Sequence, residues 1–293
     1  MAYLRDRRAF GNIGTRKFRG ARFGDPLSPR FSGLLDQYPG AAAAYSLRRL
    51  GSYGGDVVEV RRSSDSATDT FTASQITNGD LVTFCGVGDG FVSTWYDQSG
   101  NANNATQATT TAQPKIVDAG SLVTGGLDFD GVDDYLKATF GTSTSESNYA
   151  LISVATLPDS TINQTIIGTG LTDGTFGGED AWFFKRRSGL ANELSLNSGT
   201  TSIATSPAGV PSIESLFESY SDSVNTKLYS NGAELVSATS VNIDGQNLII
   251  GNRSDIGAVR ANGMFAEIIV YYSDQSANRT GIETNINAAY TIY

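Results

Sequence analysis

Carboxylate side chains are the residues of this sequence whose types and spacing best suit catalysis. Two carboxyl groups on either side of a glycosidic bond can hydrolyse it, one as the acid and the other as nucleophile or base. The candidates in chain order are Asp97, Asp128, Asp130, Asp133, Asp134, Glu179, Asp180 and Glu267. Most of them also have structural explanations. Asp130 and Asp133 fall in a glycine-containing turn, where Asp bonds to the backbone. Asp97 is expected to cap the turn that follows it, and Glu267 falls within a predicted strand.

Histidine is absent from the sequence, and Cys85 is its single cysteine. The lack of histidine excludes catalytic triads and zinc sites that depend on an imidazole. One cysteine cannot form a disulfide within the chain. Cys85 ends an apolar run, which predicts a buried core thiol rather than a reactive one.

A group of turn aspartates offers the oxygen ligands that calcium prefers. The weak candidates for a calcium site are Asp128, Asp130, Asp133 and Asp134. Their spacing does not match an EF-hand loop, and turn aspartates are common without a metal. We therefore predict no cofactor, with calcium as the one metal that these residues suit.

Exposed aromatic side chains next to polar loops could bind a sugar. Tyr53, Asp180 and Trp182 are the speculative glycan-binding residues, together with the loop at residues 170–180. The alternative is that Trp182, like Trp95, belongs to the core, which is common for tryptophan.

Basic residues are concentrated at the N-terminus. Residues 1–30 hold eight basic and two acidic side chains, whereas the rest of the chain holds 13 basic and 28 acidic ones. This asymmetry is typical of an interaction arm attached to an acidic body. The arm residues expected to bind a partner are Arg5, Arg7, Arg8, Phe10, Arg16, Lys17, Phe18, Arg19, Arg22 and Phe23.

The arm has no helix or strand period, because glycines interrupt it. One interpretation is a solvated, disordered tail. The other is a segment that becomes ordered on a partner, with aromatic anchors and arginines that pair with carboxylates or phosphates. We favour the second, because disordered segments are usually poor in aromatics. Arginines with interleaved aromatics can also bind nucleic acid, and an acidic protein surface fits equally well.

Short apolar runs separated by Gly, Ser, Thr, Asn and Asp predict a mainly β protein. Asn231-Gly232 between two such runs is a strong hairpin signal, since both residues tolerate a positive φ. Residues 41–50 begin with four alanines and include two arginines near their end, which predicts a helix with Gly51 as its C-cap. A short helix is also expected near the C-terminus. No stretch approaches the roughly 20 apolar residues that a membrane span needs.

Several motifs occur in an order known from one superfamily. Residues 127–136 have the form L-x-F-D-G-x-D-D-Y-L, residues 229–232 Y-x-N-G, and residues 263–268 G-x-F-x-E-I, with Ile250-Gly251 between the last two. This order resembles the laminin-G-like branch of the concanavalin A-like lectin/glucanase superfamily. The resemblance implies a concanavalin A-like jelly-roll β-sandwich. That fold hosts lectins, glycosidases and structural modules, so it leaves function open.

A second resemblance covers residues 41–107. Residues 60–65 are V-R-R-S-S-D and residues 96–101 are Y-D-Q-S-G-N. The same motifs, in the same order, occur early in the catalytic domain of fungal α-L-arabinofuranosidases. In that family the catalytic carboxylates lie further along, in a stretch with extra cysteines for which this chain has no match. The Y-D-Q-S-G-N segment is also similar to one in virion proteins of tailed phages.

These observations predict three parts. Residues 1–33 form a basic, extended anchoring arm, residues 34–114 a helix and strand segment that packs on the sandwich, and residues 115–293 the jelly roll with a short C-terminal helix. The fold class expected is mainly β, with few short helices.

From the resemblance, the lack of a signal peptide and the missing catalytic spacing, we predict a non-enzymatic virion structural protein of a bacteriophage. It would be a capsid decoration, head fibre or tail appendage, on the virion surface and assembled in the host cytoplasm. The arm would bind capsid or tail proteins, and the jelly roll host glycans; a homo-oligomer is expected, nucleic acid and membrane partners are not. The alternative is a carbohydrate-binding module or an arabinofuranosidase-like glycoside hydrolase.

Overall fold

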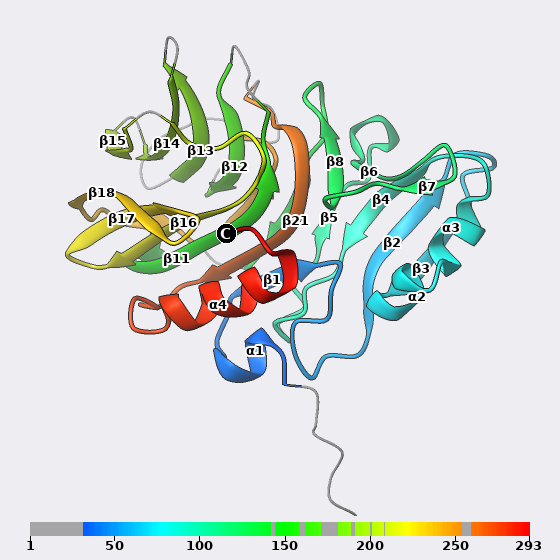
Figure 1. Cartoon of the computed structure of the whole chain (residues 1–293), viewed down its shortest axis with the longest axis horizontal. Coiled ribbons are helices and arrows are strands. Elements are labelled where there is room, and N and C mark those ends of the chain that lie inside the picture. The colour runs from blue at the N-terminus through cyan, green and yellow to red at the C-terminus, as the bar shows by residue number, and fades with distance from the viewer. Residues whose placement is uncertain are drawn as a thin grey trace, which may run out of the picture. The chain divides into compact units, whose positions relative to one another are not determined.

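The computed structural model describes residues 32–141, 144–158, 162–170, 181–188, 191–199, 201–207, 209–253 and 259–293. Strands form most of this structure, and the helices lie on its outside (Figure 1). Residues 32–293 form one compact unit. All the arm residues predicted to bind a partner lie outside the described residues, so their role stays a prediction.

One layer of the sandwich is built around two long antiparallel strands, β11 and β21, which pair along most of their length. Strands β16, β17 and β18 continue the layer beyond β11, while β1 and β8 share the other edge of β21. The bounds of these strands are β1 Ala43–Ser46, β8 Leu127–Asp130, β11 Asn148–Thr156, β16 Glu214–Asp222, β17 Asn225–Ser230, β18 Ala233–Thr239 and β21 Asn262–Tyr271.

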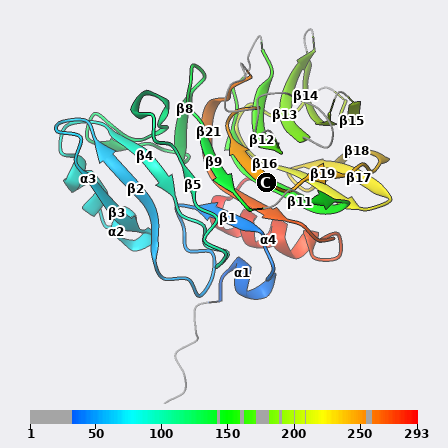
Figure 2. The ribbon, with the colours of Figure 1, turned by 180° about the vertical axis from the view of Figure 1, so that it is seen from behind.

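The other layer begins at β15 and runs through β14, β13, β12, β20, β9, β5, β4 and β2 to β3. Figure 2 shows β2, β3 and β4 on one side of the molecule and β13 to β15 on the other. The bounds are β2 Asp56–Arg62, β3 Thr68–Thr72, β4 Gly90–Trp95, β5 Ala105–Thr106, β9 Leu136–Thr139, β12 Gln164–Thr169, β13 Ala181–Ser188, β14 Ala191–Ser198, β15 Thr201–Thr205 and β20 Asn247–Ile250.

Strand β6 (Lys115–Asp118) pairs with β4, β8 and the two-residue strand β7 (Ser121–Leu122), so it connects the two layers. Strands β10 (Ser145–Glu146) and β19 (Ile243–Asp244) form a separate ribbon. A large apolar cluster that includes Leu151, Phe183 and Phe265 fills the space between the layers. This architecture confirms the predicted fold class, a mainly β jelly-roll-like sandwich with few short helices.

The helices cover outer faces. They are α1 Leu34–Gln37, α2 Ala73–Thr77, α3 Asp80–Cys85 and α4 Arg279–Tyr290, with one 3₁₀ turn at Thr110–Ala112. Helix α4, predicted near the C-terminus, lies across the outer face of β11 and β21 (Figure 1). Its residues Ile282 and Ile286, one turn apart, are fully buried in a second apolar cluster. No described helix is both long and apolar enough to span a bilayer.

The predicted helix at residues 41–50 is wrong, because these residues contain strand β1. All four of its residues are buried, and it pairs antiparallel with residues 267–270 of β21. Alanine favours helices by only about 0.5 kcal/mol per residue. Burial on both faces and a complete set of strand hydrogen bonds outweigh this local preference.

The Y-D-Q-S-G-N motif holds the other edge of β1. Asp97 Oδ1 accepts a hydrogen bond from Ala44 N at 2.9 Å, and Gln98 Nε2 donates to Ser46 O at 2.9 Å. Asp97 also accepts from Ser99 N at 2.8 Å, which confirms its predicted capping of the turn. The motif therefore replaces a neighbouring strand with side-chain amides and carboxylates, and this accounts for its residue types.

The Asn231-Gly232 hairpin is confirmed. It joins β17 to β18 with φ values of +49° and +76°. Cys85 is buried as predicted, and burial raises the pKa of its thiol, which disfavours a reactive thiolate.

Candidate functional site

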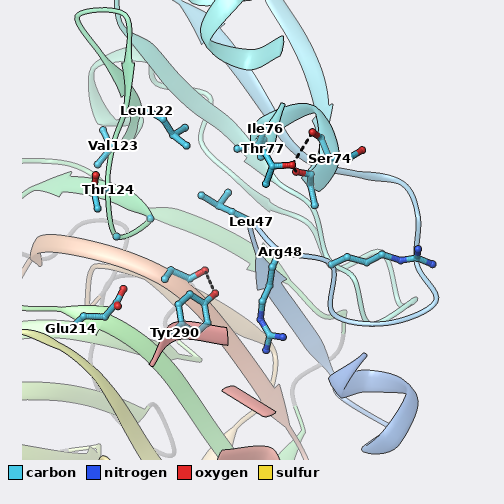
Figure 3. A pocket seen from close by; sticks show the side chains of 15 residues that line it. Leu47, Arg48, Ser74, Ile76, Thr77, Leu122, Val123, Thr124, Glu214 and Tyr290 are labelled. Atoms are coloured by element: carbon cyan, nitrogen blue, oxygen red, sulfur yellow. Dashed lines mark hydrogen bonds between the residues drawn. The ribbon is translucent and has the colours of Figure 1, made fainter. Parts of the chain in front are cut away.

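A pocket of about 810 Å³ opens between α2, the turn at the end of β7 (residues 122–126, the β7 turn) and the side of the sandwich that α4 covers (Figure 3). Its volume lies within the range of roughly 300–1,000 Å³ that is usual for small-molecule sites. The lining residues are Leu47, Arg48, Arg49, Ala73, Ser74, Ile76, Thr77, Leu122, Val123, Thr124, Gly125, Gly126, Glu214, Ala266 and Tyr290.

Glu214 is the one carboxylate in this lining. It is the first residue of β16, opposite Thr156 of β11, and it is half-buried. Burial raises the pKa of its carboxyl group. A partly desolvated carboxyl at the edge of a pocket can keep a proton for transfer to a substrate.

A second carboxylate, Glu267, lies directly behind the pocket wall. Arg48 donates from Nε to Glu267 Oε2 at 2.7 Å and from Nη2 to Oε1 at 2.9 Å. Tyr290 Oη lies 3.1 Å from the same Oε2, and burial raises the pKa of this phenol, so it stays protonated and donates. Arg48 and Tyr290 both line the pocket, so Glu267 fixes the positions of two pocket side chains while Arg48 balances its charge.

The predicted calcium residues are brought together only in part. Oxygen atoms of Asp130, Asp133 and Asp134 lie within 4.8 Å of one another, and Asp128 is not in this group. Burial raises the pKa of Asp134 to about 7. Asp130 Oδ1 accepts from Val132 N at 2.7 Å, which confirms the predicted backbone role of this aspartate. A calcium ion here stays a prediction.

Of the predicted sugar-binding residues, Tyr53 and Trp182 are described, and they are not brought together. Trp182 is 7% exposed, stacks on Phe184 with 3.7 Å between ring centroids, and donates from Nε1 to Thr165 Oγ1 at 2.8 Å. Tyr53 lines a separate small pocket and bonds to Asp56 O at 3.0 Å. Asp180 and Glu179 lie outside the described residues. Trp182 is thus a core residue by its contacts, and glycan binding by this set stays a prediction.

Sequence reasoning missed most of the pocket. Leu47, Ile76, Leu122 and Glu214 come from four distant segments. Glu214 directly precedes an alternating strand pattern, which gives no sign that its carboxyl faces a cavity. Glu267 was a candidate from sequence, and its strand position was correctly predicted.

Comparison with protein families gives one match. Residues 36–125 match the family model of the catalytic domain of α-L-arabinofuranosidase B. This confirms the resemblance expected for residues 41–107 and extends it slightly at both ends. No curated protein sequence matches the chain.

Solved arabinofuranosidase structures share the fold. A GH54 α-L-arabinofuranosidase mutant soaked with 4-nitrophenyl α-L-arabinofuranoside has a TM-score of 0.64 and 19% identity, covering 85% of this chain and 63% of that one. An arabinofuranosidase in complex with arabinofuranosyl-α-1,2-xylobiose gives 0.60 and 18%, covering 85% and 62%. The chain therefore spans less than two thirds of the length of these proteins, and at such identities the likeness concerns the fold.

These findings overturn the prediction of a non-enzymatic virion structural protein. The matching family model describes a catalytic domain, and the similar structures above are arabinofuranosidases. The predicted partners and location, which followed from the virion interpretation, have not been tested.

By sequence over residues 36–125, and by fold over 85% of its length, the chain is similar to α-L-arabinofuranosidases.

Proposed function

We propose that this protein is an arabinofuranosidase-like glycoside hydrolase that removes α-L-arabinofuranosyl groups in the pocket of Figure 3. One observation carries the proposal. Eleven of the 15 residues that line the pocket belong to the segment matched by the arabinofuranosidase B catalytic model, and the opposite wall holds Glu214. The matched segment therefore lines most of a cavity, in addition to packing against the rest of the sandwich.

Glu214 is the proposed general acid. Its raised pKa keeps a larger fraction of the carboxyl protonated near neutral pH, so it can give its proton to the leaving oxygen. Activity should accordingly fall as the pH rises through this pKa. Glu267 is the proposed second carboxylate. It acts as a positioning residue, since its carboxylate accepts hydrogen bonds from Arg48 and Tyr290 and holds both side chains at the pocket wall.

The test compares two leaving groups on the same sugar. The full-length protein should hydrolyse 4-nitrophenyl α-L-arabinofuranoside and arabinofuranosyl-α-1,2-xylobiose. Glu214→Gln should lower kcat/KM about 10²- to 10⁴-fold on the xylobioside. The loss should be much smaller on the nitrophenyl compound, whose leaving group needs little protonation.

Glu234→Gln is the matched control, because this glutamate is exposed on β18 and is absent from the pocket lining. It should keep wild-type kinetics. Absence of hydrolysis by the wild-type protein would contradict the proposed function. Equal losses on both substrates would contradict Glu214 as the acid.

A further inference from the structure

The wall of the pocket that faces Glu214 is apolar. Leu47, Ile76, Leu122 and Val123 line it from three segments: the stretch after β1, helix α2 and the β7 turn. Figure 3 shows Leu122 pointing toward Leu47 and Ile76. Leu122 is 39% exposed, although large aliphatic side chains gain free energy when they leave water. An open aliphatic surface inside a pocket of this size is suited to an apolar group on a ligand.

Three polar side chains on the same side are already engaged. Thr77 Oγ1 donates within α2, to Ser74 O at 3.0 Å, and Ser74 Oγ lies 3.1 Å from Thr72 Oγ1. The Arg48 guanidinium bonds to Glu267 and to Asn285 Oδ1 at 3.1 Å. A bare sugar exposes hydroxyl groups on every side, and burying one without a hydrogen bond is costly. This wall therefore does not suit a bare sugar.

We propose that the wall formed by Leu47, Ile76, Leu122 and Val123 binds an aromatic acyl group esterified to the arabinofuranosyl substrate. The inference rests on the proposed function, because it assigns the sugar itself to the Glu214 side. Aliphatic side chains on both faces of a flat ring exclude water from it, while the ester linkage reaches back to the polar side of the pocket.

The experiment uses a matched pair of probes with one leaving group: methyl α-L-arabinofuranoside and its 5-O-feruloyl ester. Hydrolysis is followed by release of methanol and binding by calorimetry, both with the full-length protein. The ester should have a KM about 10- to 100-fold lower, because ring burial adds favourable transfer free energy. Leu122→Ser should remove most of this difference in KM.

Two further variants distinguish a specific effect of the apolar wall on KM from a general loss of stability. Leu122→Met keeps an apolar side chain of similar volume and should keep the preference. Val224→Ser removes an exposed apolar side chain from the β16–β17 turn, which does not line the pocket, and should change neither probe.

The outcomes distinguish the two proposals. Hydrolysis of both glycosides with equal KM would overturn the aromatic wall and leave the proposed function intact. Calorimetric binding of the ester that depends on Leu122, without any hydrolysis, would support the wall and overturn the hydrolase. An equal loss on both probes in Leu122→Ser would also overturn the wall.

Discussion

Glutamates are buried at both ends of helix α4, but their charges are neutralised in different ways. At the C-terminal end, Glu267 is 1% exposed and has a bidentate partner in Arg48. At the N-terminal end, Glu218 and Glu283 share a single cation, Arg279, which pairs directly with Glu283. One end is thus balanced by charge, whereas the other holds two carboxyl groups for one guanidinium.

This difference decides where a proton must reside. Glu218 is fully buried, and its Oε2 has no donor when Glu283 is ionised. Burial raises the pKa of Glu218 well above its usual range, and the nearby charge of Glu283 and a hydrogen bond with it raise it further. A proton held between the two carboxyl groups satisfies both. An acid buried beneath this helix is thus neutralised either by an arginine or by a proton, and the proton is lost as the pH rises.

Removing the cation from the charge-balanced end of α4 should have the largest effect on the free energy of unfolding. Arg48→Met leaves Glu267 buried without its cation, which typically costs about 3–5 kcal/mol. We expect that loss of unfolding free energy in urea titrations at pH 7. Adding Glu267→Gln to the same chain should recover part of it.

Arg62→Met is the control, since Arg62 pairs with exposed Asp65 and an exposed ion pair contributes little to stability. A loss from Arg48→Met as small as that of the control would mean that the Arg48–Glu267 pair is as well solvated as a surface pair.

Replacing the proton-sharing acid should stabilise the protein at high pH. A carboxyl group with a raised folded-state pKa binds more protons in the folded than in the unfolded state, so wild-type stability should fall as the pH rises above about 4.5. Glu218→Gln removes this contribution. Each unit of raised pKa corresponds to about 1.4 kcal/mol, so we expect a gain of at least that size at pH 8.

Unfolding midpoints from pH 5 to 9 provide the measurement. Asp134→Asn is the matched comparison: because the pKa of Asp134 is raised to about 7, the fall in stability that it causes with rising pH should level off above roughly pH 7.5. If Glu218→Gln destabilised the protein at pH 8, the idea of a shared proton would have to be abandoned.

The smallest effect should come from the surface near the same end. Lys227 and Glu234 form a 3.0 Å ion pair in which both side chains are at least 40% exposed. Lys227→Met should change stability by about 0.2–1 kcal/mol, with a dependence on salt. A larger change, insensitive to salt, would show that surface charge contributes to the N-terminal end of α4 as strongly as the buried group does. Thermal unfolding at two salt concentrations measures it.

Local signals predicted the fold where local structure and packing agree. The Asn231-Gly232 turn and the alternating strands needed no knowledge of distant residues. The prediction for β1 was wrong, because alanines favour a helix locally while the partner strand lies more than 200 residues away. The Y-D-Q-S-G-N motif was recognised from sequence, but its hydrogen bonds to β1 follow only from the fold.

The candidate site was less predictable than the fold. Its carboxyl Glu214 and its apolar wall are neighbours only because β16, α2 and the β7 turn meet in space. Trp182 was singled out for its residue type, yet its ring is stacked inside the sandwich. Residue type predicted what each side chain can do, and packing decided which side chains face a cavity.

The pairing of β1 with β21 also constrains how the chain is made. Residues 43–46 are synthesised more than 200 residues before their hydrogen-bonding partners at residues 267–270. Contacts so distant in sequence carry a large loop-closure cost and are slow to form. The segment that most resembles an arabinofuranosidase must therefore wait, with one strand edge unpaired, until nearly the whole sandwich has been synthesised.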